Sequence, residues 1–375
     1  MKQLRIGIIG VGARSILAKY WHKPDGNSIV NAAADISQHS LERFKEEINE
    51  SAFITTDYQE LLARRDVDAV AVLTPDYLHE EHTIAALKAG KHVYCEKPLA
   101  ITPEGCDRII EQGNHSKTHL MIGFNMRYMP MYQTIKEIIK SGLVGDIKAV
   151  WVRHFVGFGG MFYFHDWHGK SEKTTSLLLQ KASHDIDVIH WLTDSYTTKV
   201  SGFGSLDYYG GDKPNTLTCP DCELKATCPE ASTTQLNQCA FRKEIDIEDN
   251  SMIIMELENG VKASYMQCHF TPDYSRNYTL IGTKGRIEND DINDKVYVKT
   301  RKSGSWQEMS NITYDIKKLP GTHSGADPRI CNDFVSLILE NKQPLTSPFA
   351  ARMSVAVGYA ATQSIRSGGE VIAIK

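Results

Sequence analysis

The sequence lacks an apolar run of the ~18–20 residues that a membrane-spanning helix needs, which argues against a membrane protein. It also lacks an excess of one charge, because 42 lysines and arginines stand against 46 aspartates and glutamates, for a formal net charge of −4. This balance gives no electrostatic reason to expect nucleic acid or an anionic membrane as a partner. The first residues carry neither the apolar stretch nor the cleavage site of a signal peptide, so we expect a cytoplasmic protein.

The sequence also lacks internal repeats with a period of 20–50 residues, which argues against a repeat protein. It lacks low-complexity tracts as well, which argues against disorder. What the chain does have is an ordinary globular composition, with 41% hydrophobic and 23% charged residues among 375. A chain of this length can bury a sizeable core, and it is typical of two or three domains.

The first 125 residues alternate short apolar runs with helical patterns. Ala69–Leu73 is nearly all apolar, as expected of a parallel strand that is buried on both faces. Strands that alternate with helices predict an α/β fold with a doubly wound parallel sheet of the Rossmann type. The expected strands are Leu4–Ile9, Ile29–Ala34, Ala69–Leu73, His92–Cys95 and Leu120–Gly123, and the expected helices are Arg14–His22, Ser40–Asn49, Tyr77–Ala89 and Thr102–Ser116.

The pattern changes after residue 125, where strand-like stretches separated by turns predominate and two helices, Asp327–Glu340 and Ala350–Ser367, close the chain. Runs of strands after alternating βα units predict an α+β domain with a large, mostly antiparallel sheet. We therefore predict a first domain at 1–125 and a second at 126–375, with a cysteine-rich insertion at 210–245.

The first expected strand ends in a glycine-rich loop. Gly10 and Gly12 occupy the first two positions of a G-x-G-x-x-G pattern, and Ser15 stands where the third glycine would be. The first glycine permits a tight turn, and the second lets the backbone of Gly12 and Ala13 approach a pyrophosphate at a helix N-terminus. A plain turn is the competing interpretation, but the position between a strand and a helix favours a dinucleotide site.

The second expected strand ends at Asp35, 25 residues after Gly10. A carboxylate there can accept hydrogen bonds from the adenosine ribose, and its charge would repel a 2′-phosphate. No lysine or arginine follows before Arg43. We therefore expect NAD rather than NADP, while an aspartate in an ordinary turn remains the alternative.

Two further loops follow the expected strands at 69–73 and 92–95. The first contains Thr74, Pro75 and His79, and the second contains Glu96 and Lys97. In an open α/β sheet the carboxyl ends of the strands line the ligand crevice. A lysine at such a position can stabilise the oxygen of a reacting carbonyl or hydroxyl. A lone lysine is usually a solvated charge, so the argument for Lys97 rests on its location.

These motifs together resemble the Gfo/Idh/MocA family, the group of glucose–fructose oxidoreductase, inositol dehydrogenase and their relatives. The resemblance rests on the Gly10–Gly12 loop, on Thr74-Pro75 with His79, and above all on Glu96-Lys97-Pro98. It implies an NAD-dependent dehydrogenase acting on a hydroxyl carbon of a sugar, glycoside or cyclitol. It also implies a homo-oligomer, a dimer or tetramer formed through the open face of the second sheet. The expected cofactor-binding residues are Gly10, Gly12, Ala13, Asp35, Thr74, Pro75, His79, Glu96 and Lys97.

The family's second catalytic element resembles the segment 179–187. Relatives often carry Asp-x-x-x-His there, and this chain keeps His184 but has Gln180 at the acidic position. Gln180 can hydrogen-bond a substrate hydroxyl but cannot act as a base, which leaves His184 as the expected base with Lys97 as its electrostatic partner. A structural histidine is the competing interpretation of His184. Asp185 is expected at a helix N-terminus, where it carries charge, orients His184 or touches substrate.

The expected chemistry requires that the side chains of Lys97 and His184 converge across a nicotinamide ring. His184 would remove the hydroxyl proton while Lys97 stabilises the developing alkoxide, and the hydride would pass to NAD⁺. The expected substrate-binding residues are Lys97, Arg127, Tyr128, His154, Trp167, Gln180, His184 and Asp185.

Two other functions remain open at this point. In one, bound NAD⁺ is used transiently, in oxidation-assisted glycoside cleavage or isomerisation. In the other, the dinucleotide site survives in a sensor without catalytic activity. Retention of both Lys97 and His184 argues against the sensor.

Four of the eight cysteines fall within 21 residues, at Cys219, Cys222, Cys228 and Cys239. Four thiolates complete a tetrahedral zinc site, and the Cys219–Cys222 spacing resembles a zinc knuckle. The other spacings match no zinc motif. A structural zinc ion is therefore the leading hypothesis, with reduced thiols, a disulfide or an iron–sulfur site as alternatives.

Overall fold

The computed structural model describes residues 3–301 and 306–375. The chain divides into two compact units: unit 1 comprises Met1–Pro130 and Lys318–Val355, and unit 2 comprises Met131–Lys317 and Ala356–Lys375. The predicted domain boundary at residue 125 lies close to Pro130, where the first segment of unit 1 ends. The predicted second domain differs, because residues 318–355 return to unit 1.

Unit 1 is built on a six-stranded parallel sheet in the order β3-β2-β1-β4-β5-β6. The order reverses between β1 and β4, which is the topological switch point of a Rossmann fold. The strands are β1 (Leu4–Ile9), β2 (Ser28–Ala34), β3 (Phe53–Thr55), β4 (Ala69–Val72), β5 (His92–Cys95) and β6 (Leu120–Ile122). The α-helices are α1 (Ala18–Trp21), α2 (Gln38–Glu47), α3 (Tyr58–Ala63), α4 (His79–Lys88), α5 (Pro103–His115) and α10 (Ala326–Glu340), and the 3₁₀-helices are η1 (Ala13–Leu17), η2 (Asp76–Leu78), η3 (Asn125–Tyr128) and η6 (His323–Gly325).

The predicted parallel sheet is confirmed, and its central strands show why the sequence pattern was clear. All four residues of β4 are buried, as expected of a strand covered on both faces. The predicted helix Arg14–His22 is instead a 3₁₀-helix followed by the single turn of α1. The short β3 and α3 were missed, because three residues are too few to show a period.

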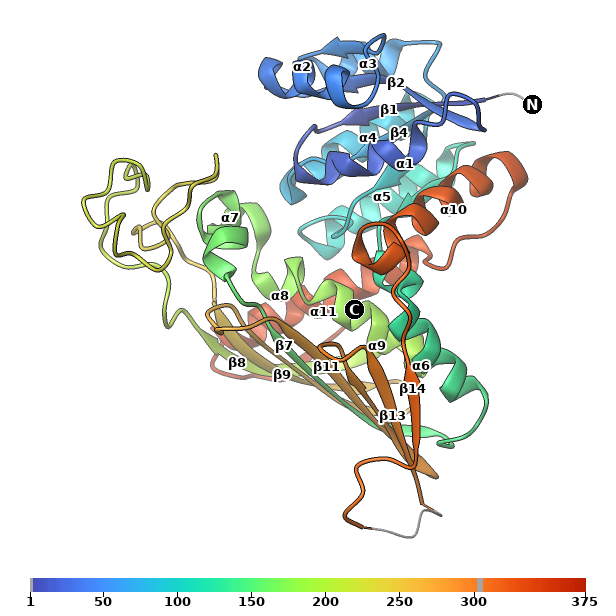
Figure 1. Ribbon diagram of the computed structural model, residues 1–375, viewed down its shortest axis with the longest axis vertical. Coiled ribbons are helices and arrows are strands. Elements are labelled where there is room, and N and C mark those ends of the chain that lie inside the picture. Colours follow the sequence, from blue (N-terminus) through green and yellow to red (C-terminus); the bar gives the residue numbers. More distant parts are fainter. Residues whose placement is uncertain (1–2, 302–305) are drawn as a thin grey trace. The chain divides into compact units, whose positions relative to one another are not determined.

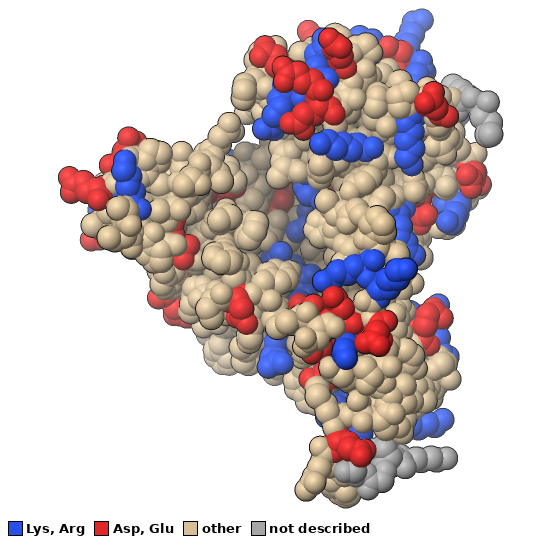
Figure 2. Space-filling view, viewed as in Figure 1, with Lys and Arg blue, Asp and Glu red and all other residues tan. Residues whose placement is uncertain are grey.

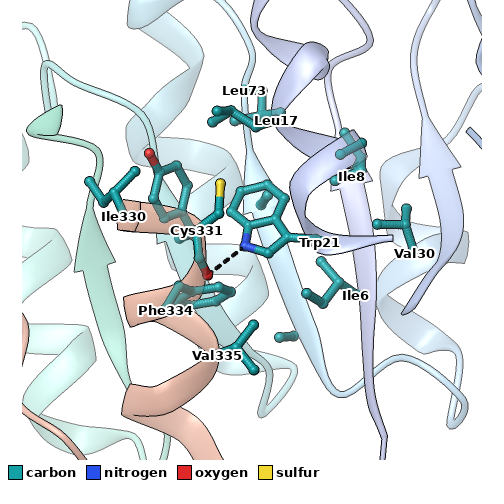
Figure 3. Close-up of a cluster of buried hydrophobic side chains, with 14 of the residues drawn as sticks. Ile6, Ile8, Leu17, Trp21, Val30, Leu73, Ile330, Cys331, Phe334 and Val335 are labelled. Atoms are coloured by element: carbon teal, nitrogen blue, oxygen red, sulfur yellow. Dashed lines mark hydrogen bonds between the residues drawn. The ribbon is translucent and has the colours of Figure 1, made fainter. Parts of the chain in front are cut away.

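The core of unit 1 joins its first strands to a helix from the end of the chain. Trp21 is fully buried and lies against Tyr94 and Phe334, with ring centroids 5.1 and 6.0 Å away. Its indole N–H donates to the carbonyl of Cys331 at 3.0 Å (Figure 3). Helix α10 therefore belongs to the dinucleotide-fold unit and not to the second domain, because its apolar face packs on the first βα turn.

Unit 2 contains a nine-stranded sheet in the order β14-β13-β12-β11-β7-β10-β9-β8-β15. All of its pairings are antiparallel except β7 with β10, so the predicted mostly antiparallel sheet is confirmed. The strands are β7 (Ile147–Phe155), β8 (Thr197–Ser205), β9 (Asn250–Leu257), β10 (Lys262–Cys268), β11 (Ser275–Gly282), β12 (Gly285–Asp290), β13 (Lys295–Thr300), β14 (Ile312–Asp315) and β15 (Ile372–Ala373). The helical segments are α6 (Pro130–Lys140), the π-helix η4 (Gly160–Phe164), η5 (Trp167–Gly169), α7 (Ser171–Thr174), α8 (Leu177–Gln180), α9 (Ser183–Thr193) and α11 (Pro348–Arg366), which begins in unit 1.

The two faces of this sheet differ. Strand β7 alternates between buried Val150, Val152 and His154 and the exposed Trp151. The buried face lies against helices, of which α8, α9 and α11 are drawn beside the sheet in Figure 1. The other face is open and carries exposed apolar side chains such as Trp151 and Ile254.

No helix within the described residues is long and apolar enough to cross a membrane. On the face of the molecule that Figure 2 shows, basic and acidic side chains are interspersed, in keeping with the small net charge.

Candidate functional site

The predicted cofactor residues of unit 1 stand in a row along one edge of the parallel sheet. Asp35 follows β2, Gly10 follows β1, Thr74 follows shortly after β4, and Lys97 follows β5. These four strands are neighbours in the sheet, and the carboxyl ends of parallel strands meet at the same edge. The fold therefore brings the motifs together although up to 87 residues of sequence separate them.

The two glycines of the loop have different surroundings. Gly10 has φ +92°, and a Cβ there would meet the backbone of Leu73 and Thr74 at 2.8 Å, so only glycine fits. Gly12 has ordinary φ, is exposed, and has nothing within 4 Å of the place a Cβ would occupy. Gly10 is therefore required by the backbone conformation and close packing of the loop. Gly12 leaves open space against the backbone, as an approaching pyrophosphate requires.

Asp35 is held in position by the glycine-rich loop itself. One carboxylate oxygen accepts the N–H of Val11 at 2.6 Å, and the other accepts the N–H of Ser37 at 2.8 Å. A carboxylate has about four acceptor sites, so two remain for ribose hydroxyls. The neighbouring Ile36 is 94% exposed, an apolar surface beside the predicted ribose site. Arg43, the first cation after Asp35, is paired with Glu47.

His79 lies inside unit 1 and joins the two loops that follow β4 and β5. Its ring nitrogens contact the carbonyl oxygens of Thr74 at 2.8 Å and Pro98 at 2.6 Å, and the side chain is 1% exposed. Burial by itself lowers the pKa of His79, but the side chains of Cys95 and Asp76 and the Pro98 carbonyl outweigh it and raise the pKa to about 10. The geometry thus assigns His79 to holding the loops together, with both ring nitrogens engaged by protein.

Glu96 is likewise engaged inside the unit. It accepts two hydrogen bonds from the Arg14 guanidinium, the shorter at 2.7 Å, and Arg14 also pairs with Asp327 at the start of α10. Burial would raise the pKa of Asp327, but His323 and Arg14 hold it well below its usual range. Glu96 therefore ties the helix that follows the glycine-rich loop to the loop that carries Lys97. Lys97 itself is half-buried, and its backbone N–H donates to the Glu96 carboxylate at 3.2 Å.

Arg127 and Tyr128, which were expected to contact substrate, are buried in unit 1. Arg127 is 6% exposed and donates to the carbonyl of Leu345 at 2.6 Å. Tyr128 is 3% exposed and belongs to the apolar core of unit 1. These contacts stabilise the packing of this segment against α10 and its neighbours, and the substrate contacts expected of Arg127 and Tyr128 stay predictions.

In unit 2, the predicted catalytic segment forms two short helices. Gln180 ends α8 and His184 lies in the first turn of α9, with Lys181 and Ala182 between them. Gln180 and His184 therefore belong to two separate helices. Gln180 is 7% exposed and His184 is half-buried.

Asp185 is at the centre of a buried polar network that connects α9 to the sheet. It pairs with the Arg276 guanidinium at 3.3 Å, accepts a hydrogen bond from the hydroxyl of Tyr278, and faces His154 at 3.4 Å. Burial alone would raise the pKa of Asp185, but Arg276, His154 and Tyr278 lower it to about 2. Asp185 is fully buried, so it supports α9 rather than lying open to a ligand.

His154 was expected to touch substrate, and this stays a prediction. Its side chain is fully buried under the sheet and contacts the Tyr265 hydroxyl at 3.1 Å and Arg276 at 3.1 Å. Burial and the Arg276 charge lower the pKa of His154 well below its usual value, so the ring is neutral. Trp167, in contrast, is only half-buried and stacks on His168 with ring centroids 3.6 Å apart.

The expected site residues do not include Tyr163, nor Lys181 and His269, which both lie against it. The Lys181 ammonium lies 5.6 Å from the Tyr163 ring centroid, and the rings of His168 and His269 stand edge-on to the same tyrosine. Burial lowers the pKa of Lys181. Tyr274, 49% exposed, lies edge-on to His154. Only the position of Lys181, between Gln180 and His184, was a signal in the sequence.

Both parts of the chain match models of one protein family. Residues 4–124 match the oxidoreductase family's NAD-binding Rossmann fold, and residues 136–374 match the same family's C-terminal alpha/beta domain. The chain belongs to the Gfo/Idh/MocA oxidoreductase family.

Several relatives of this family can be compared with the chain. The putative oxidoreductase YteT of Bacillus subtilis is 25% identical over 368 residues, which cover 86% of this chain and 85% of that protein. An inositol 2-dehydrogenase/D-chiro-inositol 3-dehydrogenase of Halalkalibacterium halodurans is 34% identical over 201 residues, 53% of this chain and 55% of that protein. The match to the named inositol dehydrogenase thus spans about half its length.

Solved structures of Gfo/Idh/MocA type share the whole fold. Scyllo-inositol dehydrogenase from Lactobacillus casei, with bound NAD(H) and scyllo-inositol, aligns with a TM-score of 0.76 at 20% identity, covering 100% of this chain and 99% of that one. Levoglucosan dehydrogenase in complex with NADH and levoglucosan aligns with a TM-score of 0.80 at 18% identity, covering 100% of both chains. At such identities the likeness shows the fold.

Membership of the Gfo/Idh/MocA family confirms the predicted resemblance, the two-part architecture and an NAD-binding oxidoreductase. It also confirms, at the level of the family, the prediction of an enzyme of the dehydrogenase type. The roles of individual residues, including the convergence of Lys97 and His184, stay predictions.

The four clustered cysteines lie together in unit 2. Cys219, Cys222, Cys228 and Cys239 line one cavity of about 20 Å³, and none of them forms a disulfide. Within residues 3–301 and 306–375, no group of three or more histidine, cysteine, aspartate or glutamate side chains is already arranged to hold a metal ion. The predicted zinc site therefore stays a prediction.

Proposed function

We propose that this chain is an NAD-dependent dehydrogenase that moves a hydride between the nicotinamide and a hydroxyl carbon of a sugar, glycoside or cyclitol. The observation that carries the proposal is the row of Gly12, Asp35 and Lys97 along the carboxyl edge of one parallel sheet. The names of the relatives, which act on inositols and levoglucosan, support the substrate class.

The residues of unit 1 fit NAD. Open space above Gly12 admits the pyrophosphate, and the exposed N-terminus of η1 follows directly. Asp35, fixed by the N–H groups of Val11 and Ser37, has acceptor sites left for the ribose diol. A 2′-phosphate would meet the Asp35 charge, and Arg43 is already paired with Glu47, so NAD is favoured over NADP.

In the proposed mechanism, the cofactor supplies a ring carbon that accepts the hydride. His184 accepts the proton of the substrate hydroxyl, and its place in the first turn of α9 fixes it on a helix anchored through Asp185. The Lys97 ammonium stabilises the negative charge that develops on the oxygen. General acid–base assistance of this kind contributes roughly 10²–10⁴-fold to the rate.

Gln180 and the half-buried Trp167 remain the proposed substrate contacts in unit 2, and we add Lys181 and Tyr274. Aromatic rings offer apolar faces for the C–H faces of a sugar ring, while the Gln180 amide and the Lys181 ammonium donate hydrogen bonds to hydroxyls. These four side chains come from α8, the adjoining turn, the 3₁₀-helix η5 and the loop between β10 and β11 of the same unit.

A substrate panel tests the proposal. The purified chain is mixed with hexoses, glycosides or inositols and with NAD⁺ or NADP⁺, and reduced cofactor is followed by its absorbance. We expect net NADH with at least one polyol and a rate with NADP⁺ at least about tenfold lower. Turnover of a glycoside without net NADH would favour transient oxidation instead, and NAD binding without turnover would favour a sensor.

We further infer that copies of the chain associate through the open face of the unit 2 sheet. Exposed apolar side chains gather there, including Trp151, Phe203 and Ile254, which are 49%, 70% and 61% exposed. Trp151, Val200 and Ile254 also line a groove of about 390 Å³. Exposed apolar patches of this kind mark interaction surfaces. Sedimentation velocity should show a dimer or larger for the native chain and a monomer for Ile254→Glu; a monomeric native chain contradicts the inference.

A further inference from the structure

The segment between β8 and β9, residues 206–249, has no helix or strand in the structure, which describes all of it (Figure 1). Its two ends are well anchored. Tyr209, Ile245 and Ile247 pack against Phe164, whose ring is stacked on Tyr209 at 3.9 Å. The Asp249 carboxylate accepts the N–H groups of residues 207–209. The base of the segment is therefore part of unit 2's packed structure.

The outer part of the segment has no such core. Within residues 211–238, all of them described, Cys219 alone is buried, and Leu224 and Leu236 are 55% and 46% exposed. Ordering so long an irregular segment costs conformational entropy that burial of apolar side chains normally offsets. Here another source of cohesion is needed, and the side chains that meet inside the segment are cysteines.

The four cysteines surround one small cavity. Cys219, Cys222, Cys228 and Cys239 line a space of about 20 Å³, together with His165 and Glu230. A cavity needs about 10–15 Å³ to hold a single water molecule, so this one accommodates a single atom or ion. An iron–sulfur cluster, which brings several iron and sulfur atoms, is too large for it.

A backbone N–H group contacts a cysteine sulfur at the cavity. The Cys219 sulfur accepts the N–H of Ser232 at 3.3 Å. Hydrogen bonds from N–H groups to sulfur stabilise the charged form that binds metal. The turn from Cys219 to Cys222 is closed by the Cys222 N–H donating to the Cys219 carbonyl at 3.3 Å.

Cys239 is brought beside this turn by the backbone. The N–H of Cys239 donates to the Leu217 carbonyl at 2.9 Å, and the N–H of Cys219 donates to the Asn237 carbonyl at 2.7 Å. Cys219 and Cys239 thus start from neighbouring antiparallel segments. Cys222 and Cys228 are half-buried at the end of the turn and further along the loop.

We propose that Cys219, Cys222, Cys228 and Cys239 bind one structural Zn²⁺ ion, which orders the outer part of this segment. Zinc favours tetrahedral thiolate ligands with Zn–S distances of about 2.3 Å. Among the described residues these side chains do not form a metal-binding group, so the proposal requires the four sulfurs to turn toward one ion. Four thiols lose four protons to the solvent as the ion binds, with no change of oxidation state. The site is independent of the proposed dehydrogenase activity.

Metal analysis of the full-length chain, purified without chelator and then incubated with equimolar zinc and desalted, tests the proposal. Mass spectrometry of the metals should find about one zinc per chain, released when a mercurial reagent blocks the thiols. Cys222→Ser and Cys228→Ser should each reduce zinc below about 0.2 equivalents and speed proteolysis within 211–238. Cys268→Ser, half-buried and outside the cluster, is the matched control and should keep its zinc.

Other outcomes overturn the proposal. These are less than about 0.2 zinc per native chain after incubation, iron in place of zinc, or an intact mass lower by about 2 or 4 Da, which indicates one or two disulfides. Should a serine variant fail to fold by circular dichroism, alkylation of the native chain decides. The four thiols should resist iodoacetamide until a chelator is added, and equal reactivity with and without chelator contradicts a metal site.

Discussion

At the scale of single residues, the two glycines of the first loop divide the work between folding and binding. Gly10 is confined by φ +92° and by backbone atoms 2.8 Å from a Cβ, while Gly12 faces open space. Substitution of these two motif glycines, two residues apart, should therefore have different consequences, for folding at Gly10 and for binding at Gly12.

Gly10→Ala and Gly12→Ala form a matched pair that tests this division. We expect Gly10→Ala to cost about 1–3 kcal/mol of unfolding free energy through strain and to lower the melting temperature by several degrees. Gly12→Ala should leave the melting temperature of the free chain unchanged and weaken NAD binding about tenfold or more, because its methyl group occupies the pyrophosphate's space. Differential scanning fluorimetry and calorimetric titration measure both. Equal NAD affinity for Gly12→Ala and the native chain would contradict the assignment.

At the scale of elements, the Asp185 network attaches α9, which carries His184, to β7 and β11 of the sheet. Asp185→Asn leaves the buried Arg276 without its counter-charge and should cost about 3–5 kcal/mol. The pKa of Asp185 is lowered from 3.8 to about 2, so its contribution is present above pH 3.8 and is lost as the pH falls through about 2. The difference between native and variant chains should shrink over that interval, as urea unfolding at a series of pH values can show.

Two variants control for this result. Asp315→Asn removes a carboxylate that is 86% exposed and 3.7 Å from Lys295, and it should produce no resolvable change. Tyr278→Phe keeps the charge and removes one donor, for a cost of about 1.5–3 kcal/mol. An Asp185→Asn variant as stable as Asp315→Asn would show that the network does not hold α9.

The elements also show how far sequence reasoning reached. The strands β1 and β5 were predicted to the residue, because nearly continuous burial leaves a clear apolar run in the sequence. The short β3 and β15 leave none. The position of α10 was also out of reach, because its amphipathic pattern says that it packs but not that its partner is Trp21, more than 300 residues earlier.

The candidate site shows the same limit. Strand ends located Gly10, Gly12, Asp35 and Lys97, since connectivity alone brings them to one edge. Burial could not be read from the motifs: His79 and His154 are polar side chains of the kind that line sites, yet each is enclosed by protein partners. Lys181 was missed because its neighbours in the sequence give no sign that Tyr163 lies near its side chain, or that His269 lies against the same tyrosine.

At the scale of the whole molecule, the residues of the proposed activity belong to two units. The dinucleotide motifs and Lys97 belong to unit 1, while His184, Gln180 and the aromatic side chains around Tyr163 belong to unit 2. The proposed activity therefore depends on residues from two separately folded cores. The central claim is that Lys97 and His184 act on the same hydroxyl group.

A double-mutant cycle on kcat/KM for the best substrate of the panel tests that claim most directly. We expect Lys97→Ala and His184→Ala each to reduce kcat/KM about 10²–10⁴-fold while NAD binding is retained. The effects of substituting residues that act in one proton transfer are strongly non-additive. The kcat/KM of the double variant should therefore be little lower than that of the less active single variant. A double variant whose loss equals the product of the two single losses, or a single variant with native activity, would contradict the account.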